Sequence, residues 1–305
     1  MFFKKLLTYT ALTALSLAFF GCMTVQQPSS TSTPQITSAV TAPAKEKLSD
    51  PLLELTCDVP VEIDLNADGT LETVVFTLTK SEAEYGDYSK ALITATAADG
   101  TVASHELELE FYELRVYAAQ LDTNSEVMTL IYSCTHSSDD TNTMFLGYEK
   151  SGFSIIPCIQ GGTESDSLYA SFQGLSDSHT LIIGEITDTL GTYYAKREYE
   201  LKDGKICALE DSHFVFNSSS IFTLKTIKEL PVTLIENDIE QSSTLPVGSE
   251  IMLTKVLSDR SKAYFETADK TVSGYITLEF NEDEFGAIIN GLHESEYFEY
   301  IPYSG

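Results

Sequence analysis

The chain of 305 residues contains no tryptophan and little positive charge. It has 18 Lys and Arg residues against 46 Asp and Glu residues, which gives a formal net charge of −28. Such an excess of negative charge repels nucleic acid and anionic lipid, so we expect neither as a partner. The acidic balance also serves simple solubility, and for that reason it selects no partner by itself.

Sequence signatures of common enzymes are missing as well. There is no G-x-S-x-G, H-E-x-x-H or G-x-x-x-x-G-K-[ST] motif, and no Rossmann glycine run follows a strand. The absence of C-x-x-C excludes zinc and thioredoxin-type sites. Without these motifs, no residue can be proposed as catalytic. Whether the protein is an enzyme stays open, and we favour a protein without enzymatic activity.

Cysteine pairing stays open from the sequence. Cys134 and Cys158 lie in apolar, strand-like stretches, where a reduced cysteine packs as a small hydrophobic residue. Export would permit disulfides, and Cys57 and Cys207 are the two other cysteines outside the N-terminal segment.

The N-terminus has the pattern of a secretion signal. Lys4 and Lys5 precede an uncharged stretch over 6–20, and Gly21 stands directly before Cys22. The apolar stretch is short of the roughly 20 residues that span a bilayer. Residues 19–22 (FFGC) resemble the lipobox of bacterial lipoproteins. The resemblance implies a signal peptide over 1–21 and fatty acylation (palmitate) of Cys22, hence a protein that faces outside and meets the membrane through its lipid anchor alone.

The alternative is an ordinary secretion signal with an incidental cysteine. That alternative needs a small-x-small cleavage site soon after the apolar stretch. The nearest clean candidate, residues 42–44 (APA), lies far downstream and contains a proline.

Residues 22–49 predict a flexible tether. They are rich in Ser, Thr, Pro, Gln and Ala and have no aromatic residue, so they cannot bury enough surface to fold. The root-mean-square reach of such a tether is on the order of 30 Å.

Residues 50–219 predict antiparallel β-structure built from an internal repeat. Leu107, Leu109 and Phe111 alternate with glutamates, as in a half-buried strand. Three apolar runs, 73–76, 129–132 and 180–183, are each followed by a turn that contains glycine. Two of these turns are Asp-Gly pairs, which favour a tight hairpin. Repeated parts at a nearly fixed period indicate a repeat architecture.

Residues 64–72 (DLNADGTLE) carry a possible metal site. Their spacing points alternate oxygen donors at one centre and suits a calcium ion. The segment resembles the first repeat of FG-GAP/VCBS-type proteins, and the resemblance implies propeller-like β-sheet repeats with calcium loops. The predicted ligands are Asp64, Asn66, Asp68, the carbonyl of Thr70 and Glu72. A metal-free acidic loop held by Asx-type hydrogen bonds is the alternative. The corresponding residues in the second repeat are Gln120, Asp122, Asn124 and Met128, so that site is degraded, and the third, around 176–179, is weaker still.

Residues 220–305 predict a second, smaller β unit. The pieces over 230–234, 245–253 and 274–276 are similar in order to a bacterial SH3-like barrel, with Tyr275 where that family usually has tryptophan. We expect the aromatic and acidic tail after about 285 to pack back on this barrel.

Together these patterns predict an all-β, monomeric, membrane-anchored envelope lipoprotein. It would be non-catalytic, carry one structural calcium ion, and bind an envelope protein, a glycan or a cell-wall polymer. The alternative is a secreted hydrolase that acts on glycan or peptidoglycan with scattered carboxylates. The segment 136–140 (HSSDD), which gathers a histidine, hydroxyls and carboxylates, is interpreted as a polar loop. A solute-capturing lipoprotein is disfavoured because the two-lobed α/β pattern is missing.

Overall fold

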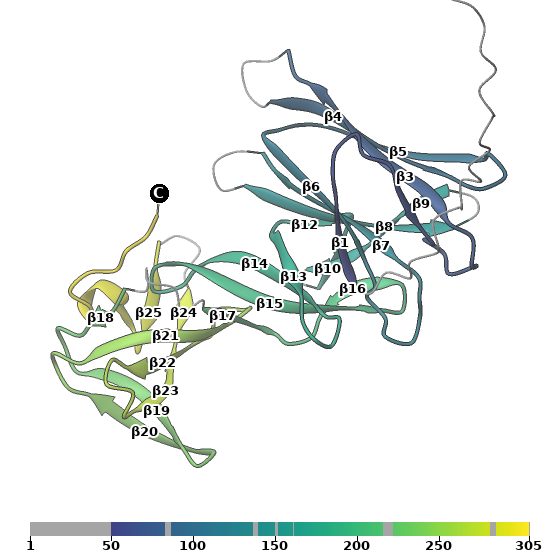
Figure 1. Ribbon diagram of the computed structural model, residues 1–305. Helices are drawn as coiled ribbons and strands as arrows, with labels where there is room; N and C mark the ends of the chain where they lie inside the picture. The colour runs from purple at the N-terminus through teal and green to yellow at the C-terminus, as the bar shows by residue number, and fades with distance from the viewer. Residues whose placement is uncertain are drawn as a thin grey trace, which may run out of the picture. The chain divides into compact units, whose positions relative to one another are not determined.

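The structure, a computed structural model, describes residues 50–82, 87–136, 140–149, 152–160, 162–215, 222–280 and 285–304 (Figure 1). Cys22, the predicted signal peptide and the tether lie outside these ranges. The chain divides into one unit up to Glu46 and a second unit from Lys47 onward. All that follows concerns the second unit.

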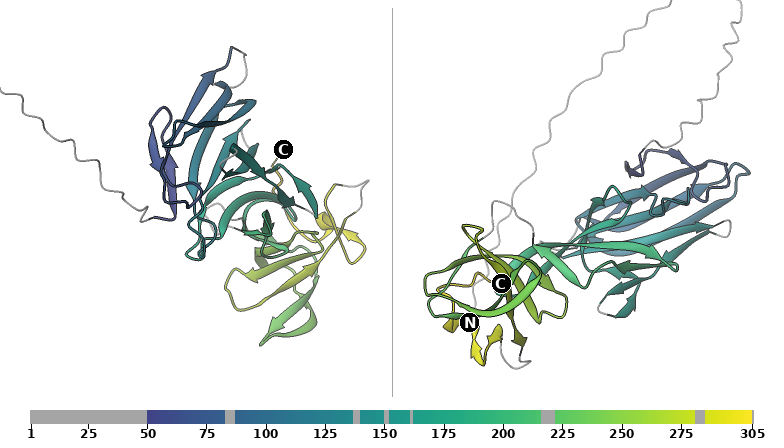
Figure 2. Two further views of the ribbon diagram at one scale, coloured as in Figure 1. Left: turned by 90° about the vertical axis from the view of Figure 1, so that its right-hand side faces the viewer. Right: turned by 90° about the horizontal axis from the view of Figure 1, so that it is seen from below.

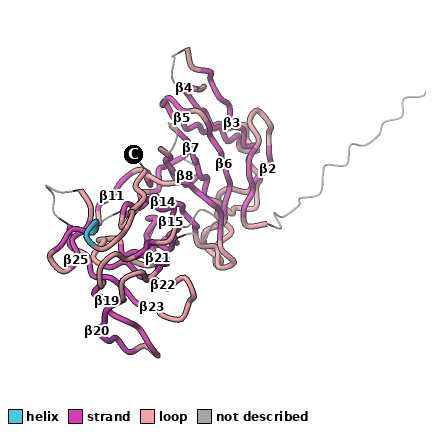
Figure 3. The backbone as a smooth tube through the Cα atoms, turned by 90° about the vertical axis from the view of Figure 1, so that its left-hand side faces the viewer, coloured by secondary structure: helices cyan, strands magenta, loops and turns pink. Residues whose placement is uncertain are grey.

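The described residues confirm the all-β prediction. They form 26 strands and a single 3-10 helix, Glu294–Glu296, which is the short cyan segment of Figure 3. The pairings within the four sheets are antiparallel except for one parallel pair, β10 (Cys158–Gln160) with β16 (Lys205–Ala208). Across the described ranges, no helix is long and apolar enough to cross a membrane.

The first sheet is a meander of four antiparallel strands, here called the first meander and shown from two further sides in Figure 2. Its strands are β2 (Val61–Ile63), β3 (Glu72–Lys80), β4 (Tyr88–Thr96) and β5 (Val102–Phe111). Alternate residues of β3, from Glu72 to Phe76, are buried, as period-two patterning requires. Gly100, at φ 84°, occupies the predicted turn between β4 and β5.

Two more four-stranded meanders follow along the chain. The second meander comprises β6 (Glu113–Ala119), β7 (Thr129–Thr135), β8 (Thr141–Glu149) and β9 (Gly152–Ile156). The third comprises β13 (Ser171–Leu175), β14 (Leu181–Asp188), β15 (Thr192–Lys202) and β16. Their edges are extended by β1 (Leu52–Leu55), β12 (Ser167–Leu168), β10 and β11 (Thr163–Ser165).

The second meander is buried on both faces. Leu130 and Tyr132 of β7 belong to a hydrophobic cluster shared with the first meander. Ile131, which points the other way, belongs to a cluster shared with the third meander. Because fully burying such a side chain stabilises a fold by about 1.5–3 kcal/mol, this two-sided packing joins the three meanders into a stack.

The C-terminal part continues the third meander without a break in hydrogen bonding. Strand β17 (Ser212–Val215) pairs with both β15 and β21 (Glu250–Leu257), so one sheet passes across the predicted boundary near 219. A separate core fills this part, and Phe265 and Ile276 lie at its centre. The remaining strands are β18 (Leu224–Lys225), β19 (Leu230–Glu236), β20 (Ile239–Leu245), β22 (Lys262–Thr267), β23 (Ser273–Thr277), β24 (Glu279–Phe280), β25 (Ala287–Ile289) and β26 (Leu292–His293).

The aromatic tail packs back only in part. Tyr297 and Phe298 are buried in the C-terminal core, and Thr226 forms an antiparallel bridge with Phe298. Phe285 and Tyr300 are instead 71% and 72% exposed, so for these two residues the prediction of a packed tail is wrong. Tyr297 and Phe298 end the 3-10 helix, where the backbone N–H groups of both donate to the Glu294 carbonyl, and Tyr300 lies beyond these bonds.

Candidate calcium loop and adjoining groove

The predicted calcium loop joins β2 to β3. Its base is the paired residues Ile63 and Glu72, and its tip reverses direction through Ala67 and Gly69, at φ 59° and 82°. A left-handed backbone at two positions lets the chain curl around its own side chains.

Hydrogen bonds within the loop are of the Asx type. The carboxylate of Asp64 accepts from the backbone N–H of Asp68 at 3.1 Å and of Gly69 at 2.8 Å. Asp68 accepts from the N–H of Thr70 at 2.8 Å, and Asn66 accepts from the N–H of Asp68 at 3.1 Å. The structure therefore gathers Asp64, Asn66 and Asp68 at the tip, with bonds that shape the loop before any ion arrives.

Glu72 completes the loop from below. Its side chain is buried, with 2% of the residue exposed, and its Oε2 accepts from the N–H of Leu65 at 3.0 Å. Burial raises the pKa of Glu72, the bond from Leu65 opposes that rise, and the negative charges of Asp68 and Asp64 raise the pKa further. A divalent cation would relieve the repulsion among the three carboxylates.

The donor set fits calcium in its chemistry. Carboxylate, amide and carbonyl oxygens from alternate loop positions are ligands that calcium accepts in irregular geometry. In the part of the chain that the structure describes, no three His, Cys, Asp or Glu side chains converge into a ready-made cage. Binding would thus require the Asp64 and Asp68 side chains to move from backbone amides toward the ion.

The loop between β13 and β14 keeps part of the shape of the first loop, and neither later loop keeps its full donor set. Between β13 and β14, His179 takes the left-handed conformation at φ 63°, and the N–H of Thr180 donates to Ser176 Oγ at 3.2 Å. Donor and acceptor of this bond are four residues apart, as they are in the bond from Asp68 N–H to the Asp64 carboxylate. Between β6 and β7, Met128 occupies the position of Glu72 and is buried in the core. Because Met128 brings a thioether where Glu72 brings a carboxylate, and Ser176 a hydroxyl where Asp64 does, the first loop offers a hard cation the better donor set.

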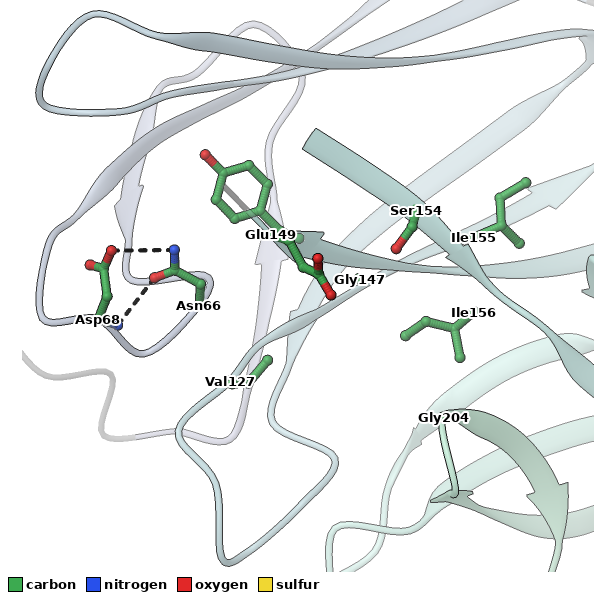
Figure 4. Close-up of a pocket in the computed structure, with 10 residues that line it drawn as sticks. Asn66, Asp68, Val127, Gly147, Glu149, Ser154, Ile155, Ile156 and Gly204 are labelled. Atoms are coloured by element: carbon green, nitrogen blue, oxygen red, sulfur yellow. Dashed lines mark hydrogen bonds between the residues drawn. The ribbon is translucent and has the colours of Figure 1, made fainter. Parts of the chain in front are cut away.

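A groove of about 590 Å³ opens beside the calcium loop (Figure 4). Asn66 and Asp68 form one end, and Gly204 of the third meander's β15–β16 turn lines another part of the wall. The second meander supplies the rest: Val127, Gly147, Tyr148, Glu149, Ser154, Ile155 and Ile156. Since all three meanders contribute, the shape of the groove depends on the loop that calcium would stiffen.

The predicted polar loop at 136–140 contains no assembled triad in its described residues. The His136 ring is held by the Glu110 carbonyl at 3.0 Å from Nδ1 and by the Asn142 amide at 3.1 Å from Nε2. Asp140 accepts a short hydrogen bond from Tyr169. Residues 137–139 lie outside the described ranges.

A buried network around Glu185 escaped the sequence analysis. Glu185 accepts from the hydroxyl of Tyr199 at 2.5 Å and from Nε2 of His213 at 2.6 Å. Burial acts to raise the pKa of Glu185, but the bonds from His213 and Tyr199, with the charge of Arg197, outweigh it and hold that pKa below its ordinary value. The available signal was a single carboxylate inside the apolar run 181–186. His213 lies far away in sequence and gave no signal.

This network lies within the sheet face and lines neither the groove nor the second cavity, which is formed by β19, β20 and β25 residues. Tyr199 is fully buried, and Nδ1 of His213 has no hydrogen-bond partner among the described residues. The arrangement serves to fill a polar gap between two hydrophobic cores. Comparison of the chain with family models, with curated proteins and with solved structures finds no match.

Proposed function

We propose that the protein is a lipid-anchored, non-catalytic component of the bacterial cell envelope that binds an envelope protein, a glycan or a cell-wall polymer. The observation that carries the proposal is the groove beside the oxygen-rich loop of 64–72, to which all three meanders contribute. In this proposal Cys22 is acylated, the tether of 22–49 spaces the β-sheets from the membrane, and one calcium ion is structural.

Three four-stranded antiparallel meanders in a row support a propeller-like arrangement, since the blades of a propeller are sheets of this kind. The sheet from β19 to β23 around its own core supports an SH3-like C-terminal unit. The strand orders of these sheets are open, so we propose a stack of propeller-like blades without closure.

Calcium would supply two positive charges to a loop that carries three carboxylates. Asp64, Asp68 and Glu72 would hold it with Asn66 and the Thr70 carbonyl. The ion would then fix Asn66 and Asp68 at the end of the groove, and the ligand would meet a rigid wall. No position is left for substrate chemistry.

Thermal unfolding with and without calcium tests the metal site. For dissociation constants of about 10⁻⁴ to 10⁻³ M, 10 mM calcium stabilises the folded state by roughly 1.4–2.7 kcal/mol, or roughly 3–10 °C in Tm. Glu72→Gln keeps the acceptor for Leu65 N–H and removes one repelled charge. We therefore expect it to raise Tm without calcium and to abolish the calcium response. Equal Tm values for the unsubstituted protein with and without calcium would remove calcium from the proposal.

Capture on purified cell wall tests the groove. Ile155→Asp places a charge in the groove, where Ile155 is 37% exposed, and Ile227→Asp is the matched control at a 50% exposed position that does not line it. We expect the first variant to lose retention and the second to keep it. Equal retention of both variants would rule out the groove as the binding surface.

The hydrolase alternative would have to use Glu185 and His213, the one carboxylate–imidazole pair that the described residues bring together. Release of soluble fragments from peptidoglycan decides this point. Fragment release by the unsubstituted protein that Glu185→Gln abolishes would establish the hydrolase, and the non-catalytic proposal would fall.

A further inference from the structure

A row of lysine and aromatic residues crosses five neighbouring strands. The registers place Lys196 of β15 opposite Phe214 of β17, and Phe214 opposite Lys255 of β21. Lys255 is opposite Tyr264 of β22, which is opposite Tyr275 of β23. Residues that face each other across neighbouring strands have their side chains on the same side of the sheet. The strands can be followed in this order in Figure 1. These five residues are called the cross-strand row below.

The cross-strand row faces outward. The residues one position away along each strand, which point to the opposite side, are all buried: Ala195, Val215, Val256, Ala263 and Ile276. In the row itself Phe214 is 37% exposed, and Lys196, Lys255 and Tyr264 are half-buried. Tyr275, at the end of the row under Lys262, is buried, with 6% of the residue exposed. At ~4.8 Å between strands, the row is about 19 Å long, which is enough for several sugar rings.

Aromatic rings, rather than carboxylates, hold two of the lysines on this face. The ammonium group of Lys255 lies 4.5 Å from the ring centre of Tyr264 and 5.6 Å from that of Phe214. Lys262, two residues before Tyr264, lies 4.1 Å from the ring centre of Tyr275. These contacts hold the ammonium groups above flat apolar rings.

The charge of these lysines stands out against the rest of the chain. Four of the other described lysines pair with carboxylates, as Lys90 does with Glu106 and Lys205 with Glu164. Lys228 instead lies 5.6 Å from the ring centre of Tyr297. Over the same described ranges, no ion pair joins Lys196, Lys255 or Lys262 to a carboxylate.

Carboxylates border the cross-strand row without entering it. Glu240 accepts from the Tyr275 hydroxyl at 2.9 Å. Asp259 is close enough to feel the charge of Lys262, but it accepts its hydrogen bond from Ser261. A chain of net charge −28 thus presents one outward strip where an anion meets positive charge.

We infer that the cross-strand row, with Lys262, binds an anionic glycan, a carbohydrate polymer that carries carboxylate, sulfate or phosphate groups. The lysines would meet the anionic groups, and the rings of Phe214 and Tyr264 would stack on the apolar faces of sugar rings. This inference goes beyond the proposed function, because the cross-strand row is a surface separate from the groove. A single-stranded nucleic acid also combines rings and charges, so the test includes one as a competing probe.

The test uses the purified full chain in mild detergent and four probes. Dextran sulfate carries sugar and charge, dextran carries the same sugar without charge, polyphosphate carries charge without sugar, and an oligothymidylate is the nucleic-acid probe. We expect dextran sulfate to bind at least tenfold more tightly than each of the others, and more weakly as salt increases. Equal binding of polyphosphate or of the oligothymidylate would overturn the assignment to a glycan, and absence of dextran sulfate binding would overturn the site.

Matched variants locate the site. Replacing Lys196, Lys255 and Lys262 together by glutamine removes the two charges of the row and the charge of Lys262. The control replaces Lys80, Lys202 and Lys225 by glutamine and has the same net charge. We expect the first variant to lose about tenfold in affinity, about 1.4 kcal/mol, and the control to lose less than twofold. Equal losses would mean that net charge, not the row, governs binding.

Phe214→Ser tests the stacking, with Tyr300→Ser as the control at an exposed position off the row. We expect weaker dextran sulfate binding for Phe214→Ser alone, at unchanged melting temperature. An unchanged affinity of Phe214→Ser for dextran sulfate would refute the stacking of aromatic rings on the sugar. These outcomes are independent of Cys22 acylation and of cell-wall capture through the groove, so this inference and the proposed function can fail separately.

Discussion

Replacing Glu185 by alanine removes the acceptor of a buried network. Tyr199, fully buried, loses the acceptor of its hydroxyl at 2.5 Å, and Nε2 of His213 loses its acceptor at 2.6 Å. Each buried polar group left without a partner costs about 1–3 kcal/mol, and breaking a buried charge pair from one side costs about 3–5 kcal/mol. We therefore expect Glu185→Ala to lower the free energy of unfolding by about 3–5 kcal/mol.

The matched control is Glu164→Ala. Glu164 pairs with Lys205 at 2.5 Å, a distance close to that of the Glu185 bonds, but both side chains are about half exposed. An exposed pair contributes at most about 1 kcal/mol. Urea unfolding followed by circular dichroism and tyrosine fluorescence measures both variants. A loss in Glu185→Ala no larger than the loss in Glu164→Ala would refute the claim that burial of the network determines its contribution.

The same network predicts a pH dependence. The pKa of Glu185 lies below its ordinary value of 4.5, so the folded state favours the ionised form. The stability that this provides is present above about pH 4.5 and is lost as the pH falls toward the lowered pKa. We expect the difference between the unsubstituted protein and Glu185→Ala to shrink below pH 4.5. A difference that stays constant from pH 7 to pH 3 would contradict this assignment.

Two further predictions concern packing and thiols. Gly274→Ala would place a Cβ 2.2 Å from the Thr233 carbonyl oxygen, so we expect it to lower the free energy of unfolding by an amount at the upper end of the ~1–3 kcal/mol typical of overpacking. Gly147→Ala, whose nearest contact is at 3.5 Å, should lower it less. Equal urea midpoints for the two variants would refute this. Burial raises the pKa of Cys134 to about 11 and of Cys158 to about 12. Alkylation of the native protein at pH 8 should therefore modify the half-buried Cys57 and Cys207 first. Mass mapping that finds Cys134 or Cys158 modified first would contradict the described packing.

Local patterns predicted the strands and turns well. The apolar run 73–76 became part of β3, and Asp99-Gly100 and Asp203-Gly204 became the turns before β5 and β16, because these signals lie within a few residues of each other. The grouping of Asp64, Asn66 and Asp68 followed from spacing within one loop. Whether calcium binds there stays a prediction.

Features that depend on pairing between distant strands could not be predicted. Glu185 and His213 are 28 residues apart, and their contact depends on the registers of β14, β15 and β17. The cross-strand row exists only because four separate registers align Lys196 with Tyr275. The parallel pairing of β10 with β16 is non-local in the same way. A shift of one residue in any of these pairings would turn the side chains to the other face, and no local motif fixes such a shift.

The most direct test of the proposed function is the mass of the N-terminal peptide of the mature protein, isolated from the membrane fraction of the cells that make it. The account predicts a chain that begins at Cys22 and carries fatty acids on that residue. A mature protein found free in solution, with an unmodified thiol at Cys22, would contradict it.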